Sequence, residues 1–166
     1  GHKEIGFGPC QRSLQIAAKS TFQRNTMAVK AGLAAMLEAK PDAVVMVGPY
    51  APLAAFIKEA RAAGLKSQLA TVSFVGTDNL VAEVGKDGDG VVISQVVPFP
   101  DDNDLPIQRE CREALQANGG ERLGFVNFEG CITAKVMVAA LERAGKDPER
   151  ATLVSSLQGM SGVDLG

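Results

Sequence analysis

The sequence predicts an α/β protein, in which a parallel sheet with its covering helices is followed by a purely helical segment. The apolar run 44–47 has no polar alternation, which is typical of a strand covered on both faces of a parallel sheet. Strand-like and helical patterns alternate as far as residue 97, in the order β-α-β-α-β-α-β, which favours right-handed crossovers between parallel strands. Beyond the Pro-rich stretch 98–106, only helical patterns follow.

The alternating half is expected to contain strands and helices in turn. In chain order we expect strands at 14–23, 42–47, 68–74 and 91–97, and helices at 27–39, 51–63 and 77–85. Thr26 and Thr77 are the predicted N-caps of the first and third helices, because a threonine hydroxyl can accept from a free N–H of the first turn. Gly64 is expected just beyond the second helix, where a left-handed backbone favours glycine.

The second half is expected to contain helices and no strand. The stretch 98–106 holds three prolines and three aspartates and is predicted to be a connector. Helices are expected at 107–118 and 128–144, and Asp147 followed by Pro148 predicts a third helix that runs to about residue 157. We therefore divide the chain into a loose lead-in at 1–13, an α/β lobe at 14–98, a connector at 99–106 and a helical segment at 107–166.

Composition and charge argue against several classes of protein. The net charge of −2 gives no electrostatic reason to expect a nucleic acid or an anionic membrane surface as partner. One tyrosine, seven phenylalanines and no tryptophan do not supply a stacking platform for single-stranded nucleic acid. No apolar run reaches the length of a membrane span, and the first residues, 1–4, lack the apolar segment of a signal peptide.

The cysteines Cys10, Cys111 and Cys131 leave two interpretations open. No CxxC spacing is present, so they form no zinc or thioredoxin-type motif. Packing as free, buried thiols is the interpretation we favour, because free cysteine is among the most buried residue types. The alternative is a disulfide between Cys111 and Cys131, with Cys10 left over.

The residues argue for a binding protein rather than an enzyme. The single histidine, His2, lies at the extreme start of the chain, so no Ser-His-Asp or Cys-His arrangement and no metal site is expected, and no glycine-rich cofactor loop is present. In open α/β sheets, ligands bind beyond the carboxyl ends of the strands. The candidate ligand-binding residues in the turns after the second and third expected strands, which should face one cleft, are Pro49, Tyr50, Ala51, Ser73, Phe74 and Asp78.

Several segments, in this order, resemble those of a known family. They are QRNT at 23–26, KPDAVV at 40–45, YAP at 50–52, ARAAGL at 60–65, VGTDNL at 75–80, GVVISQVVP at 90–98, FEG at 128–130 and AALERAG at 139–145. Together they resemble the branched-chain amino-acid type of ABC-transporter substrate-binding proteins, which are type I periplasmic binding proteins. The resemblance implies no cofactor, a periplasmic location, a membrane permease as partner, and an amino acid or related small organic solute held between two α/β lobes.

The same resemblance implies that the chain is incomplete relative to the family. Residues 21–90 resemble part of the C-terminal lobe, 91–98 resemble a hinge crossing, and the later helices resemble a pair from the other lobe, whose sheet has no counterpart here. Tyr50 matches a position that contacts the ligand. Ser73 falls near the position of an acid that pairs with a ligand ammonium, so this counter-charge is absent. Asp78 is either its substitute or a first-turn carboxylate that stabilises its own helix.

Two further expectations concern the whole molecule. The same fold also serves as the ligand-sensing domain of signalling and transcription-regulatory proteins, so that function is the alternative. The two helices after the connector retain apolar stripes, Ile107, Cys111 and Leu115 on the first and Ile132, Val136, Ala139 and Ala140 on the second, although the sheet they would cover is missing. Because soluble monomers rarely keep large apolar patches exposed, we expect a homodimer, with elements exchanged about the connector.

Overall fold

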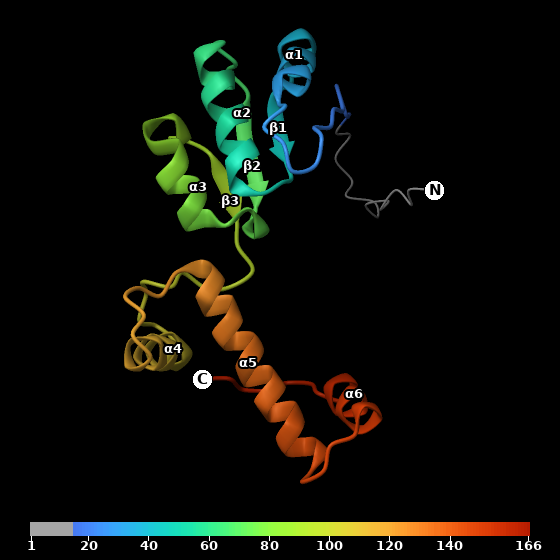
Figure 1. The fold of residues 1–166 in the computed structure, drawn as a ribbon, viewed down its shortest axis with the longest axis vertical. Coiled ribbons are helices and arrows are strands. Elements are labelled where there is room, and N and C mark those ends of the chain that lie inside the picture. Colours follow the sequence, from blue (N-terminus) through green and yellow to red (C-terminus); the bar gives the residue numbers. More distant parts are fainter. Residues whose placement is uncertain (1–14) are drawn as a thin grey trace.

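The computed structural model describes residues 15–166, and its elements form an α/β unit followed by a helical unit (Figure 1). The α/β class predicted from the sequence is confirmed. In chain order the elements are α1 (Lys30–Ala39), β1 (Ala43–Met46), α2 (Tyr50–Ala62), β2 (Gln68–Val72), the 3₁₀ turn η1 (Ser73–Val75), α3 (Thr77–Val84), the 3₁₀ turn η2 (Gly85–Gly88), β3 (Val92–Ser94), α4 (Pro106–Ala117), α5 (Phe125–Ala144) and α6 (Arg150–Gln158).

The sheet is parallel, with its strands in the order β1-β2-β3. Its cross-strand rows include Val45, Ala70 and Val92, and next to them Met46, Thr71 and Ile93. The strand expected at 14–23 is not formed within the described residues, which begin at residue 15. Ile16 is 85% exposed and has no strand to pair with, because β1 pairs only with β2. A partial alternation does not make a strand without a neighbour to bond.

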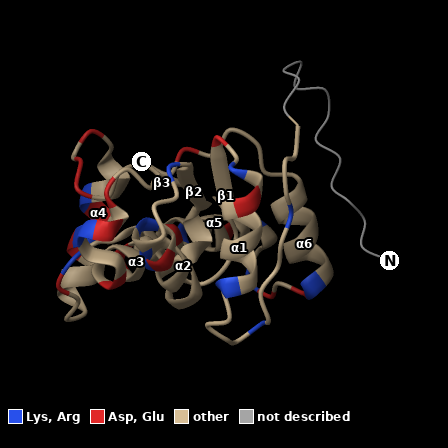
Figure 2. Ribbon diagram, turned by 90° about the horizontal axis from the view of Figure 1, so that it is seen from above, with Lys and Arg blue, Asp and Glu red and all other residues tan. Residues whose placement is uncertain are grey.

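All three helices of this unit lie on one face of the sheet, as Figures 1 and 2 show from two directions. On that face Val44 and Met46 are buried, whereas Val45 and Val47 on the other face are 72% and 60% exposed. The expectation that the run 44–47 is covered on both faces is therefore wrong for the part of the chain that the structure describes. Continuous apolarity marks a strand that can be buried on both faces, but helices on both sides are needed to bury it.

The covered face packs against a dense helical layer. On α2, Leu53, Ile57 and Ala60 recur at helical spacing and are 2%, 0% and 0% exposed. Leu69 of β2 and Leu80 of α3 are each 1% exposed and belong to the same core. Since burying an aliphatic side chain of the size of leucine is worth roughly 1.5–3 kcal/mol, this layer holds the unit together.

Three predicted N-caps are wrong by one to three residues, because other residues take the cap position, and α5 begins at Phe125, three residues before its predicted start. Thr26 instead closes a turn, in which its Oγ1 donates to the Gln23 carbonyl at 2.7 Å, and α1 begins at Lys30. Gly76 is the N-cap of α3 in place of Thr77, which is the first helical residue. Glu149 precedes α6 in place of Asp147. The expected helix at 51–63 with Gly64 beyond it is confirmed, because α2 ends at Ala62 and Gly64 has φ +76°.

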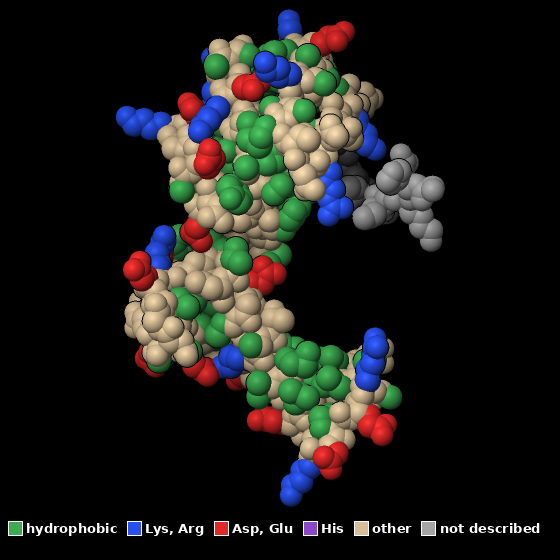
Figure 3. All heavy atoms as spheres, viewed as in Figure 1, with side chains coloured by type: hydrophobic (Ala, Val, Ile, Leu, Met, Phe, Trp, Pro, Cys, Tyr) green, Lys and Arg blue, Asp and Glu red, His purple; other side chains and the backbone are tan. Residues whose placement is uncertain are grey.

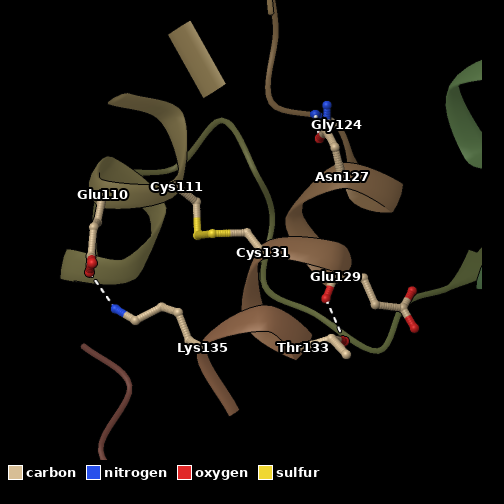
Figure 4. Close-up of a disulfide and its surroundings, with 8 residues drawn as sticks. All are labelled: Glu110, Cys111, Gly124, Asn127, Glu129, Cys131, Thr133 and Lys135. Carbon is tan, nitrogen blue, oxygen red and sulfur yellow. Dashed lines mark hydrogen bonds and ion pairs between the residues drawn. A yellow bond between two sulfur atoms is a disulfide. The ribbon is translucent and has the colours of Figure 1, made fainter. Parts of the chain in front are cut away.

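The helical unit has its own small core around a disulfide. Cys111 of α4 and Cys131 of α5 are bonded, with their Cα atoms 6.0 Å apart, as Figure 4 shows. The interpretation of these two residues as free thiols is wrong, and Cys10 lies outside the described residues. The apolar residues of this core are Ile107, Leu123 and Phe128, with Val97, Leu115, Ile132 and Leu165 packed against them. The chain therefore leaves the sheet after β3 and enters a second core at Val97.

The two units give the molecule a hollowed outline. Figure 3 shows the hollow on the side between the α/β unit and α6. α5 runs away from the sheet and meets the α/β unit near α3. Within residues 15–166 no helix combines the length and apolarity that crossing a membrane requires.

Candidate ligand-binding site

The strands of the sheet point toward the helical unit, so the turns that follow β1 and β2 lie at the edge facing it (Figure 1). The turn after β1 is tight. A Cβ on Gly48 would lie 2.6 Å from Leu53 Cδ1 and 2.9 Å from Phe22 Cζ, so only glycine fits without moving the core. Pro49 follows in an extended conformation as the N-cap of α2, which places Tyr50 at the first helical position. Gly48 and Pro49 therefore determine where α2 begins and place Tyr50 at the edge of the sheet.

Tyr50 lies beside the second turn. The ring atom Cδ1 of Tyr50 is 4.0 Å from the point where a Cβ on Gly76 would stand. Gly76 has φ +80°, a left-handed conformation that glycine adopts without strain. Tyr50 is 40% exposed, so part of its surface remains open to solvent at this edge. The structure thus places at one sheet edge the two turns that were expected to lie together.

The remaining candidate residues of these turns differ in exposure. In η1, Val75 is 2% exposed and anchors the turn, Ser73 is half-buried, and Phe74 is 62% exposed. Pro49 is exposed and Ala51 is half-buried at the start of α2. The edge is therefore an open surface with an aromatic side chain from each turn.

Tyr50 lines neither of two open pockets, each of about 390 Å³, on the described part of the chain. One lies at the opposite end of the sheet and includes Lys40, Asp42 and Ser67. The other lies between the two units and is lined by Asp78, Arg122, Gly124, Val126 and Asn127. Of the six candidate residues, Asp78 alone contributes to either cavity.

Asp78 lies in the first turn of α3, against the helical unit. Its Oδ1 is 3.9 Å from Arg122 Nη1, and a Cβ on Gly124 would be 2.3 Å from its Oδ2. Arg122 also donates from Nη2 to Asp101 Oδ2 at 2.7 Å. This hydrogen bond is the largest cause that holds the pKa of Asp101 below its ordinary value; desolvation opposes it, and the charges of Arg122 and Arg112 lower the pKa by less. The same bond raises the pKa of Arg122.

Sequence reasoning missed Arg122 and Gln95. Arg122 is far from Asp78 in the chain, and no spacing rule connects the two residues. Gln95, which follows β3, donates from Nε2 to Thr77 Oγ1 at 2.8 Å and so ties the departing chain to the start of α3. A polar residue within the expected strand 91–97 was the only available signal for Gln95.

A family model described as periplasmic binding protein matches residues 11–166. The chain belongs to the periplasmic binding protein family. The match takes in every element of both units and all six candidate residues. No curated protein sequence matches the chain.

Solved structures share the fold over part of their length. A possible leucine/isoleucine/valine-binding protein from Rhodopirellula baltica is 36% identical, with a TM-score of 0.81, over 87% of this chain and 40% of its own. A substrate-binding periplasmic protein from Ralstonia solanacearum is 30% identical, with a TM-score of 0.76, over 87% of this chain and 42% of its own. A branched-chain amino-acid ABC transporter protein from Thermus thermophilus with bound valine is 24% identical, with a TM-score of 0.70, over 83% of this chain and 37% of its own, and it supports the fold alone. The chain thus spans about two fifths of the length of these proteins.

Proposed function

We propose that this chain is part of the solute-binding component of a bacterial ABC importer, which acts in the periplasm and passes its solute to a membrane permease. The observation that carries the proposal is the edge formed by Tyr50 and the Gly76 turn, in a chain of this family. It presents two open aromatic side chains and the starts of two helices toward a second unit. The role is binding, without chemical conversion of the solute.

The proposed ligand contacts are Pro49, Tyr50, Ala51, Ser73, Phe74 and Asp78. Aromatic surface suits an apolar side chain on the solute, and free N–H groups at the starts of α2 and α3 suit a carboxylate. An ammonium group on the solute would find few carboxylates to pair with among these residues. Ser73 carries no charge, and Asp78 already lies 3.9 Å from a guanidinium nitrogen of Arg122. We therefore propose an amino acid or a related organic acid with an apolar side chain.

The division of the chain belongs to the same proposal. Residues 14–98 would form one lobe and 107–166 part of the other, joined through 99–106, and closure about the chain after β3 would cover the solute.

The chain on its own would associate as a homodimer. Support comes from Met137, Val138 and Leu141, which leave α5 with exposed apolar surface. Sedimentation at micromolar concentration tests that association.

A solute titration followed by amide NMR tests the binding proposal. Leucine and the 2-oxo acid with the same side chain form the pair of ligands, since they differ only in the ammonium group. We expect shifts centred on the amides of Tyr50 and Gly76 for at least one of them, and their loss in Tyr50→Ala. Val81→Ala is the control, because Val81 is exposed on α3 outside the six proposed contacts.

Two results would contradict the proposal. Shifts confined to the far cavity around Lys40 and Ser67 would move the site to the other end of the sheet. Equal binding by the wild-type chain and Tyr50→Ala would remove Tyr50 from the site. A preference for the 2-oxo acid would identify the solute as an acid without an ammonium group, as the absence of a carboxylate at Ser73 suggests.

A further inference from the structure

The helical unit consists of two pieces that a disulfide joins. The first piece is α4 with the connector before it, and the second, which we call the arm, is α5 with α6. Cys111 of α4 and Cys131 of α5 are bonded to each other across the boundary between the two pieces (Figure 4). How firmly the arm is held therefore depends on this bond and on what else joins the pieces.

α4 holds the connector through two polar side chains. Gln108 is 1% exposed, and its amide is bonded at both ends: Oε1 accepts from the Leu105 N–H at 2.8 Å, and Nε2 donates to the Phe99 carbonyl at 2.7 Å. Arg112 donates from Nη2 to the Pro100 carbonyl at 2.7 Å. Pulling the buried amide away would be costly, because both of its ends would be left unpaired. α4 and the connector therefore form one piece.

The two helices of the arm are held together independently of the disulfide. The Ser156 hydroxyl of α6 donates to the Ala140 carbonyl of α5 at 2.9 Å, and Ala140 is 0% exposed. The start of α5 is closed by Asn127, whose Oδ1 accepts from the Gly124 N–H at 2.6 Å. Breaking the disulfide removes none of these contacts, because they lie within the arm and the turn that leads into it.

The other ties between the two pieces are weak. Lys135 of the arm pairs with Glu110 of α4, and Arg122, in the loop that leads into α5, pairs with Asp101 of the connector. These four side chains are 28–67% exposed, and ion pairs between solvent-exposed groups contribute little to stability. The apolar core that the pieces share has four buried residues among those described, and one of them is Cys111 itself. The covalent bond is therefore the main tie.

The two sulfur atoms differ in how an external thiol can reach them. Cys111 is 2% exposed, whereas Cys131 is half-buried. Asn127 and Ala134, one turn to either side of Cys131 on α5, are exposed, so this part of the helix is open to solvent. Lys135 lies beside the bond, and a nearby ammonium group favours thiolates over thiols (Figure 4). An external thiolate should therefore attack Cys131, with Cys111 as the leaving group.

We propose that the disulfide is a redox-sensitive lock on the arm, which a protein dithiol of the thioredoxin type opens. One thiolate of that reductant attacks Cys131 Sγ, the bond to Cys111 Sγ breaks, and Cys111 leaves as a thiolate that takes up a proton. The second thiol of the reductant then attacks the mixed disulfide, so that Cys131 is released as a thiol and the reductant keeps the disulfide. Two electrons and two protons pass to the protein.

The opened lock leaves the arm free to turn relative to α4 and the connector. The hollow between the α/β unit and α6, which Figure 3 shows, would then change its width with the redox state. The inference depends on neither the solute nor the permease, because it rests on contacts within the helical unit and its connector.

A monothiol identifies the sulfur atom that is attacked. The chain carries Cys10→Ser, so that only the two bonded cysteines remain, and it is incubated with reduced glutathione without denaturant, quenched in acid and digested at low pH. Mass spectrometry should find about tenfold more glutathione on the Cys131 peptide than on the Cys111 peptide, because the buried sulfur is harder to reach. Equal amounts on both peptides, or reaction only in urea, would overturn the proposal.

Residual dipolar couplings before and after reduction test the movement of the arm. In the oxidised chain the amides of α4, α5 and α6 should fit a single alignment tensor. After reduction by a thioredoxin-type dithiol, α5 and α6 should still share a tensor and α4 should require a different one, and reoxidation should restore the single tensor. Glu110→Gln is the control, because it removes an ion pair between the pieces and keeps the disulfide, so the oxidised variant should still fit a single tensor.

Two outcomes of the coupling measurement would contradict the lock. A single tensor for α4 and α5 after reduction would show that other contacts hold the arm. Loss of the helical chemical shifts of α5 would show that the arm unfolds instead of turning. Cys111→Ala with Cys131→Ala, measured without reductant, should also require two tensors, which separates the effect of the bond from that of the reductant. Neither measurement involves the solute, so a failure of the lock and a failure of the proposed function are distinguishable.

Discussion

Arg122 donates from Nη2 to Asp101 Oδ2 at 2.7 Å, and this bond ties the loop before α5 to the connector that follows the sheet. The other guanidinium nitrogen, Nη1, reaches Asp78 of α3 at 3.9 Å. One side chain therefore bridges both units at the place where they meet. Bridges between exposed groups contribute little to stability, so we assign Arg122 a positioning role and not a stabilising one.

Titration of Asp101 tests this arrangement. The hydrogen bond from Arg122 lowers the pKa of Asp101 from its ordinary value of 3.8, so the ion pair is fully present above that pH and is lost as the pH falls through the lowered pKa. Carboxyl NMR should give a midpoint below 3.8 in the wild type and a midpoint closer to 3.8 in Arg122→Gln. Lys86→Gln removes a cation in η2 and should leave the midpoint unchanged. If the Asp101 midpoint is the same in the wild type and in Arg122→Gln, the hydrogen bond between Arg122 and Asp101 does not persist in solution.

The turn at Gly76 should be sensitive to a single methyl group. Gly76 has φ +80°, so Gly76→Ala forces a strained backbone and should lower the free energy of unfolding by about 1 kcal/mol, even though the new Cβ meets only ordinary contacts. Gly130→Ala is the matched control. It lies inside α5 with open space around the added Cβ, and should raise stability by about 0.5–1 kcal/mol. Urea unfolding of both variants measures the difference, and equal effects would contradict it.

The parts of the fold that follow local rules could be predicted from the sequence. The apolar stripe of α2 and the left-handed Gly64 determine their own structure, and both were predicted correctly. The strand expected at 14–23 was not, because strand formation depends on a neighbour that no local pattern reveals. The expectation that both faces of β1 are covered failed for the same reason, since the run 44–47 does not show on which faces helices are present to bury it.

The candidate site likewise contains some features that the sequence predicted and others that it did not. That Tyr50 and the Gly76 turn share one sheet edge follows from the parallel topology, which the sequence predicted. The approach of Arg122 to Asp78 joins two units through a connector whose path no periodicity specifies. The disulfide was one of two open alternatives, because the distance between Cys111 and Cys131 depends on how α4 and α5 pack.

Two buried threonines of the α/β unit should respond in opposite directions to the same substitution. Thr71 is 3% exposed, and its Oγ1 has no hydrogen-bond partner among the described residues. Thr71→Val removes that unsatisfied hydroxyl and should raise the free energy of unfolding by about 1 kcal/mol. Thr77 Oγ1 accepts from Gln95 at 2.8 Å, so Thr77→Val should lower it by about 1–3 kcal/mol. Urea midpoints decide the signs, and a loss of stability in Thr71→Val would indicate an unseen partner for its hydroxyl.

Removing the disulfide should weaken the helical unit and leave the sheet intact. Cys111 and Cys131 are 20 residues apart, and a bond that closes a loop of this length contributes about 3 kcal/mol in the chain-entropy treatment. The two units have separate cores, one around Ile57 and Leu69 and the other around Phe128. The loss should therefore be local. In the double variant Cys111→Ala with Cys131→Ala, amide hydrogen exchange in α4 and α5 should accelerate by about a hundredfold, as 3 kcal/mol implies. Exchange in β1 and β2 should be unchanged, and treating the wild type with a reductant should reproduce the pattern. An equal acceleration in the sheet would show that the two units unfold as one.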